Sequence, residues 1–202
     1  MTAERVPNLV KRRVPSYLIR EIINDKPYFY KGYRDVLAKR KTIEEIMGSS
    51  VLQAFIIHIL DAFLRDFLNR KEFLIATSEA GVHFGRNDNA ANDIAVYRFE
   101  HIKNLFSVRY FDIPAELVIE VDVKVELEKN QEIEYVVEKT EKMIQAGTKQ
   151  VLWFLTKTKK VLIAKEAKNW TLHDWDVDIK LFEGSVLNIK TLLDEYNLGN
   201  ND

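Results

Sequence analysis

The segment that decides the fold runs from Leu117 to Leu155, with LVIEV at residues 117–121 and VLWFL at residues 151–155. Both pieces are short, apolar and rich in β-branched or aromatic residues, as in strands that are covered on both faces. Between them, apolar residues recur at helical spacing from about Gln131 to Ala146, and Gly147 supplies a C-terminal stop. The order strand, helix, strand predicts a βαβ unit whose two strands are parallel neighbours.

Further strands and helices are expected on both sides of this unit. The segments Tyr17 to Ile23 and Tyr28 to Tyr33 are aromatic and β-branched, and the turn residues between them predict a β-hairpin. Val51 to Leu68 has helical spacing, with Ser49 or Ser50 as its cap. The remaining expected elements are strands at 73–77, 94–97 and 161–164, antiparallel strands within 170–182, and a short helix over 186–196. The predicted fold class is α/β, with a mixed central β-sheet flanked by helices.

Composition limits the possible classes of protein. A chain of 202 residues with 47% apolar content suits one domain, which we expect over residues 16–198 after a flexible, basic N-terminal arm at 1–15. A formal net charge of −1 excludes a globally polycationic binder, and the absence of cysteine excludes disulfides and thiolate chemistry. With no signal peptide or membrane-spanning stretch in this sequence, we expect a soluble, cytoplasmic protein with no membrane partner.

Several common sites are absent from the sequence. The four histidines, His58, His83, His101 and His173, lack the spacing of a helical zinc pair. No glycine-rich phosphate loop, dinucleotide fingerprint or GxSxG elbow occurs, which argues against nucleotide-binding and serine-hydrolase functions.

Carboxylates placed near predicted strand ends are the informative feature. Asp93 opens the strand expected at 94–97, and Glu120 lies in the otherwise apolar string LVIEV. A buried carboxylate is costly unless it is paired, protonated or bound to metal. Strand alternation predicts that Glu120, Asp122 and Lys124 point to one face. Since Mg²⁺ prefers hard oxygen ligands, Asp93 and Glu120 are candidate ligands for it.

Three strings carry a resemblance to a known family: NDIAVY at 92–97, AELVIEV at 115–121 and EKTEKMIQAGTKQVLWF at 138–154. They resemble the Uma-type restriction endonucleases of the PD-(D/E)XK nuclease superfamily, over most of the chain from Tyr17 to Phe154. The resemblance implies a restriction-endonuclease-like fold, Mg²⁺ or Mn²⁺ as cofactor and DNA as substrate. By position it implies catalytic roles for Asp93, Glu120 and Lys139, and a metal site made by Asp93, Glu120 and Glu79.

The sequence departs from the family in two places. Asn92 stands where the family has proline, a position that shapes the turn and supplies no ligand. After LVIEV the family usually has a Ser-Pro type turn, whereas here a charged run makes Asp122 and Lys124 alternative catalytic residues. A helical wheel places Lys139 just past the shoulder of its apolar stripe, so its side chain would have to curl back to reach Glu120.

Two functions from different classes remain open. The first is a Mg²⁺-dependent endonuclease that hydrolyses DNA phosphodiester bonds. Because cleavage of both strands usually needs two active sites, a homodimer is the assembly that fits this function. The alternative is a catalytically inactive nuclease-fold module that binds nucleic acid or protein. A structural oligomer is a third option. Eight acidic residues against four lysines from 120 to 142 disfavour DNA binding there without metal, so DNA contacts are expected at Lys39, Arg40 and Lys41 and at the basic residues 11–13.

Overall fold

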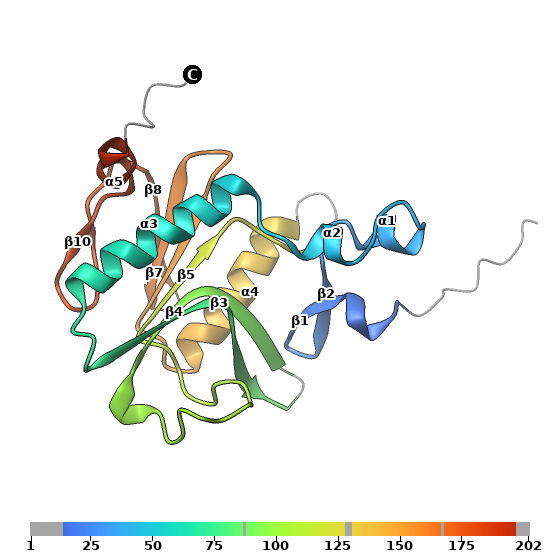
Figure 1. Cartoon of the computed structure of the whole chain (residues 1–202), viewed down its shortest axis with the longest axis horizontal. Coiled ribbons are helices and arrows are strands. Elements are labelled where there is room, and N and C mark those ends of the chain that lie inside the picture. The colour runs from blue at the N-terminus through green and yellow to red at the C-terminus, as the bar shows by residue number, and fades with distance from the viewer. Residues whose placement is uncertain (1–13, 87, 128–130, 167, 197–202) are drawn as a thin grey trace, which may run out of the picture.

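The central feature is one large mixed sheet. The computed structural model describes residues 14–86, 88–127, 131–166 and 168–196, and within them eight strands form this sheet in the order β2-β1-β4-β5-β6-β7-β8, with β3 paired to β4 (Figure 1). The strands are β1 (Ile19–Ile23), β2 (Lys26–Phe29), β3 (Phe73–Gly85), β4 (Asp88–Arg98), β5 (Leu117–Val121), β6 (Gln150–Leu155), β7 (Lys160–Glu166) and β8 (Asn169–Asp174). A separate pair is formed by β9 (Ile179–Lys180) and β10 (Val186–Leu187).

Helices cover both faces of this sheet (Figure 1). α3 (Val51–Phe67) packs in the core on one face and α4 (Gln131–Gln145) in the core on the other. The other described helices are α1 (Tyr33–Leu37), α2 (Glu44–Met47) and α5 (Ile189–Glu195), with 3₁₀ turns at Ser16–Leu18 and Phe99–His101. Alternate residues of β5 join different cores: Ile119 packs with α3, and Val118 packs with α4. This alternation confirms the α/β class with a mixed central sheet flanked by helices.

The predicted βαβ unit is present. β5 and β6 are parallel, with Leu117 opposite Gln150, and α4 connects them across one face. Gly147 ends the helix in the left-handed region at φ +111°, where its amide donates to the carbonyl of Ile144. The predicted helix at 51–68 is α3, capped by Ser50, whose hydroxyl accepts from the Gln53 amide while the Gln53 side chain accepts from the Ser50 amide.

The N-terminal hairpin is also present but shorter than expected. Asn24 and Asp25 both have positive φ and form the tight turn between β1 and β2. β2 ends at Phe29, and the short helices α1 and α2 follow in a segment where no helix was expected. Neither helix has a buried residue, so no apolar stripe marks them.

The hairpin of β3 and β4 corrects a sequence prediction. Strands were expected only at 73–77 and 94–97, but the pairing extends to Gly85 and Asp88. A bulge between Thr77 and Ala80 shifts the register of the pairing, which continues on its far side as the second half of the hairpin. The second half is polar and rich in small residues, so its strand character comes from cross-strand pairing rather than from propensity. Asp93 therefore lies inside β4 rather than at its start.

Some expectations fall outside the part of the chain that the structure describes. Residues 1–13, which include most of the expected arm and its basic residues Lys11, Arg12 and Arg13, are outside it, as are residues 197 and 198 at the end of the expected domain. Among the described helices, none is long and apolar enough to cross a membrane.

The contact of α3 with the sheet supplies a test of the fold. Leu60 is fully buried against the sheet, whereas Val51 at the start of the same helix is 89% exposed. Leu60→Ala should lower the free energy of unfolding by about 2–5 kcal/mol, because it leaves a cavity in a packed core. Val51→Ala should change it by less than about 0.5 kcal/mol. Urea unfolding of both variants measures the difference, and similar losses would contradict the packing of this face.

Candidate active site

Asp93 and Glu120 lie side by side on neighbouring strands. β4 and β5 are antiparallel with Ile94 opposite Ile119, so the next residues in register, Asp93 and Glu120, face each other. Both point to the α4 side of the sheet, because Ile94 and Ile119 point to the α3 side. They are 2% and 3% exposed. Two buried carboxylates on one face agree with the geometry expected from the sequence.

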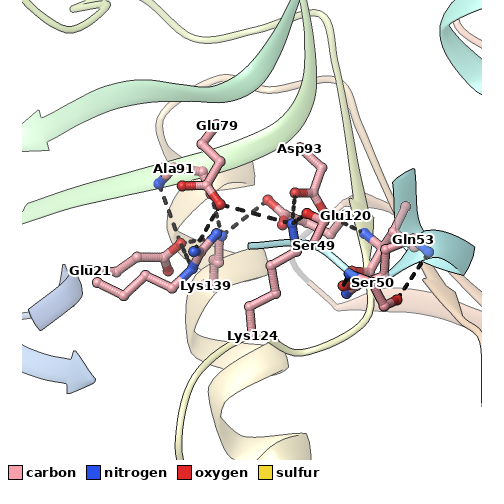
Figure 2. A network of polar contacts seen from close by, with 12 residues as sticks. Glu21, Ser49, Ser50, Gln53, Glu79, Ala91, Asp93, Glu120, Lys124 and Lys139 are labelled. Carbon is pink, nitrogen blue, oxygen red and sulfur yellow. Dashed lines mark hydrogen bonds and ion pairs between the residues drawn. The ribbon is translucent and has the colours of Figure 1, made fainter. Parts of the chain in front are cut away.

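The carboxylate of Asp93 has two hydrogen-bond donors. The amide of Val121 donates to its Oδ2 at 2.8 Å, which fixes the side chain against the end of β5. Lys124 Nζ donates to its Oδ1 in an ion pair, and Figure 2 shows this lysine reaching up to Asp93. Lys124 therefore reaches the site, as the sequence allowed.

Lys139 projects from α4 between two carboxylates. Its Nζ lies 3.0 Å from Glu120 Oε1, donates to Glu21 Oε1 at 2.7 Å, and donates to the carbonyl of Ala91 at 2.9 Å (Figure 2). The side chain is 1% exposed. The lysine thus reaches Glu120, as the helical wheel required, and its ammonium is enclosed by protein oxygens.

Glu21 is a site residue that the sequence analysis missed. It is buried, and it accepts hydrogen bonds from Lys139 and from Tyr135 Oη at 2.7 Å. The amide of Ala91 donates to it at 3.3 Å. A signal was present, because alternation in β1 places Glu21 on the same buried face as Ile23. Glu21, like Glu120, is a carboxylate within a β-branched strand, although Arg20 precedes it.

Glu79 lies at the edge of the cluster. It sits in the bulge of β3 with φ +61°, and Arg20 Nη1 donates to its Oε1 at 3.0 Å. Lys124 Nζ is 4.0 Å from the same oxygen. Its part in a metal site stays a prediction.

Asp122 has a different environment from the one expected. β5 ends at Val121, and Asp122 adopts φ +59°, so strand alternation does not continue through it. Its carboxylate accepts hydrogen bonds from the amide and the hydroxyl of Thr156, just after β6. The prediction that Asp122 shares the orientation of Glu120 is wrong, because the chain turns at that residue. Asp122 instead links the residue after β5 to Thr156, the residue after β6, by two hydrogen bonds.

Burial governs the protonation of the central pair. It raises the pKa of Glu120 to about 8; the ammonium of Lys139 opposes this shift, while Asp93 and Glu21 add to it. Burial alone would lower the pKa of Lys139, but the charges of Glu120 and Glu21 outweigh it and the pKa is raised. Lys139 therefore stays charged, and the carboxylate of Glu120 takes up a proton as the pH falls below its pKa of about 8.

A cleft of about 550 Å³ opens at Lys124, the lysine that pairs with Asp93, while Asp93 and Glu120 themselves lie behind its lining. Lys124 lines it, and so do three exposed lysines, Lys31, Lys41 and Lys157. Of the three DNA contacts expected from the sequence, Lys41 lines this cleft, whereas Arg40 forms an ion pair with Asp35. Lys39 is exposed with φ +57°. Glu45, Asp122 and Glu132 also line the cleft, so its charges are mixed, with basic side chains in excess.

The donor set can be compared with the needs of a hard divalent cation. Asp93 and Glu120 supply carboxylate oxygens from adjacent strands, and Glu120 Oε1 is buried without a well-aligned hydrogen bond. Mg²⁺ is commonly held by one or two carboxylates together with water, so this pair fits it. Among the described residues, no three or more acidic or histidine side chains form a complete metal cluster. Any cation held here would need water or substrate oxygens as further ligands.

Comparison with known proteins supports the fold. No model of a known protein family matches the chain, and no curated protein sequence matches it. Among solved structures, the fold is similar to that of a candidate nuclease belonging to DUF820 from Anabaena variabilis ATCC 29413, with a TM-score of 0.60 and 15% sequence identity. The match covers 86% of this chain and 89% of that chain. The chain therefore has a nuclease-like α/β fold.

The enclosed ammonium of Lys139 predicts a large effect on stability. Lys139→Met should lower the free energy of unfolding by about 3–5 kcal/mol, because Glu21 and Glu120 lose their shared cation while buried. Lys142→Met is the control on the same helix: Lys142 is 22% exposed and pairs with one carboxylate, that of Asp88, so its loss should be clearly smaller than that of Lys139→Met. Chemical denaturation compares the two, and equal losses would count against the buried network.

The raised pKa of Glu120 predicts a dependence of stability on pH. Between the ordinary value of 4.5 and about 8, the folded protein holds a proton that the unfolded chain has released. The free energy of unfolding should therefore fall as pH rises through this window and level off above it. Glu120→Gln should lack this component. Urea unfolding with EDTA at pH 5, 6, 7 and 8 measures both slopes, and parallel curves would show that Glu120 does not titrate this way.

Proposed function

We propose that the protein is a metal-dependent nuclease of the PD-(D/E)XK type that hydrolyses DNA phosphodiester bonds. The observation that carries this proposal is the pairing of Asp93 and Glu120 on adjacent strands, with Lys139 beside Glu120 and a lysine-lined cleft next to them. The fold similarity to a candidate nuclease and the sequence resemblance to Uma-type restriction endonucleases support the same conclusion.

Each residue has a distinct task in this proposal. Asp93 and Glu120 would hold Mg²⁺ or Mn²⁺, with Glu79 near enough to take part through water. Such a cation would supply Lewis acidity and lower the pKa of an attacking water. Lys139 orients Glu120 and adds positive charge close to the reacting phosphate, which favours the transition state of hydrolysis.

The cleft provides the binding surface for DNA in this proposal. Lys31, Lys41 and Lys157 line it, and no ion pair within the described residues engages their ammonium groups. Lysines of this kind bind phosphate groups without reading sequence. The substrate backbone would therefore run along the cleft and bring one phosphate to the carboxylates.

A comparison of two aspartates on β4 tests the proposal. Asp93→Asn keeps the shape of the side chain and removes a metal ligand, so cleavage should fall by roughly a hundredfold or more. Asp88→Asn is the control, because Asp88 lies on the same strand but pairs with Lys142, and it should cut at close to the wild-type rate. The measurement is cleavage of plasmid and single-stranded DNA with Mg²⁺ or Mn²⁺, against EDTA.

Binding is measured in parallel to separate the two functional classes. DNA affinity in EDTA should not fall in either variant, since metal ligands act on the transition state rather than on ground-state binding. Wild-type protein that binds DNA but never cuts it with either metal would replace the nuclease proposal with a nucleic-acid binding module. Unchanged cleavage by Asp93→Asn would remove Asp93 from the site.

A further inference from the structure

Lys124 is a charged side chain of the site that the proposed function leaves without a task. Its Nζ pairs with Asp93, lies 4.0 Å from Glu79 Oε1, and donates to the hydroxyl of Ser49 at 3.5 Å. It also lines the cleft. The side chain is 15% exposed, against 1% for the side chain of Asp93. Lys124 therefore lies between the cleft and a buried carboxylate.

The placement of Asp93 makes this lysine the first contact for an incoming ion. Asp93 is not among the residues that line the cleft, whereas Lys124 is. A cation that approaches through the cleft would meet the ammonium before it meets the carboxylate. Because a buried carboxylate without a partner is costly, the ammonium also stabilises Asp93 in the absence of metal.

The two lysines of the site differ in their freedom to move. Lys139 is enclosed by Glu21, Glu120 and the carbonyl of Ala91. Lys124 follows the end of β5, outside any regular strand or helix, and its long side chain borders open space in the cleft. Only Lys124 can exchange its place with another cation without opening the core.

We propose that Lys124 is a resident counter-ion that competes with the divalent cation for Asp93 and swings into the cleft when that cation binds. The inference rests on the proposed metal site and adds a control on its loading. An ammonium and a divalent ion on the same carboxylate repel each other strongly at such short range, so binding of one displaces the other. The lysine thus lowers the affinity of the site for metal while holding the empty site stable.

Metal binding without DNA tests this competition. Mn²⁺ binding to the full chain is measured by calorimetry and by the shift in melting temperature, for wild type, Lys124→Met, Lys124→Gln and Lys142→Met. Lys124→Met should bind Mn²⁺ at least about tenfold more tightly than wild type, which corresponds to about 1.4 kcal/mol. Lys124→Gln should show the same direction, and it keeps a hydrogen-bond donor for Asp93 if the Met variant folds poorly. Lys142→Met should match wild type.

The possible results separate this inference from the proposed function. Equal Mn²⁺ affinity in wild type and both Lys124 variants would overturn the competition and leave the metal site standing. Weaker binding in the Lys124 variants would also overturn it. No Mn²⁺ binding by any variant would overturn both the competition and the metal-dependent function. Adding Asp93→Asn to Lys124→Gln should abolish the tightened binding, and tight binding that persists would place the metal elsewhere.

Discussion

The structure depends on one buried ammonium group. Lys139 Nζ, enclosed between α4 and the sheet, contacts Glu21 on β1, the Ala91 carbonyl on β4 and Glu120 on β5. A charge of this kind is tolerated inside a protein only when polar groups surround it closely. The contact joins α4 to the N-terminal hairpin and to the two central strands. The register of β4 and β5 places Glu120 beside Asp93, and Lys139 pairs with Glu120 from the helix above them.

Charge balance explains why this cluster is suited to a cation. Among the described residues, the connected side chains of the cluster are four carboxylates, Glu21, Glu79, Asp93 and Glu120, and three cations, Arg20, Lys124 and Lys139. One negative charge is in excess, and the proton that Glu120 retains at neutral pH compensates it. In the proposed metal-bound state, a divalent ion that released this proton and displaced Lys124 would balance the same carboxylates. The proposal therefore relates two states of the site that have the same net charge.

The sequence predicted the elements whose residues carry a periodic pattern. The unit of β5, α4 and β6, the hairpin of β1 and β2, and α3 were all expected, because apolar spacing and turn residues define them locally. The second half of the β3–β4 hairpin and the role of Glu21 were not, because both depend on pairing between distant segments. Asp122 was misplaced for a similar reason: its positive φ and its bonds to Thr156 arise only where β5 meets β6. Local pattern thus placed Asp93 and Glu120, while tertiary contacts supplied their partners.

From the sequence, both Lys139 and Lys124 were candidates for the catalytic lysine, and in the structure the two differ in burial and in the carboxylate that each contacts. Lys139 is enclosed and holds Glu120, so it can act on the reaction only through its charge and through the carboxylate it orients. Lys124 borders the cleft and covers Asp93, so it can meet both an incoming ion and an incoming phosphate. A module that only bound nucleic acid would gain affinity from the exposed lysines of the cleft. It would gain none from the two carboxylates that are buried behind Lys124. The cost of that burial is explained when the carboxylates must be kept ready for a cation, which is why the paired acids, rather than the basic cleft, favour catalysis.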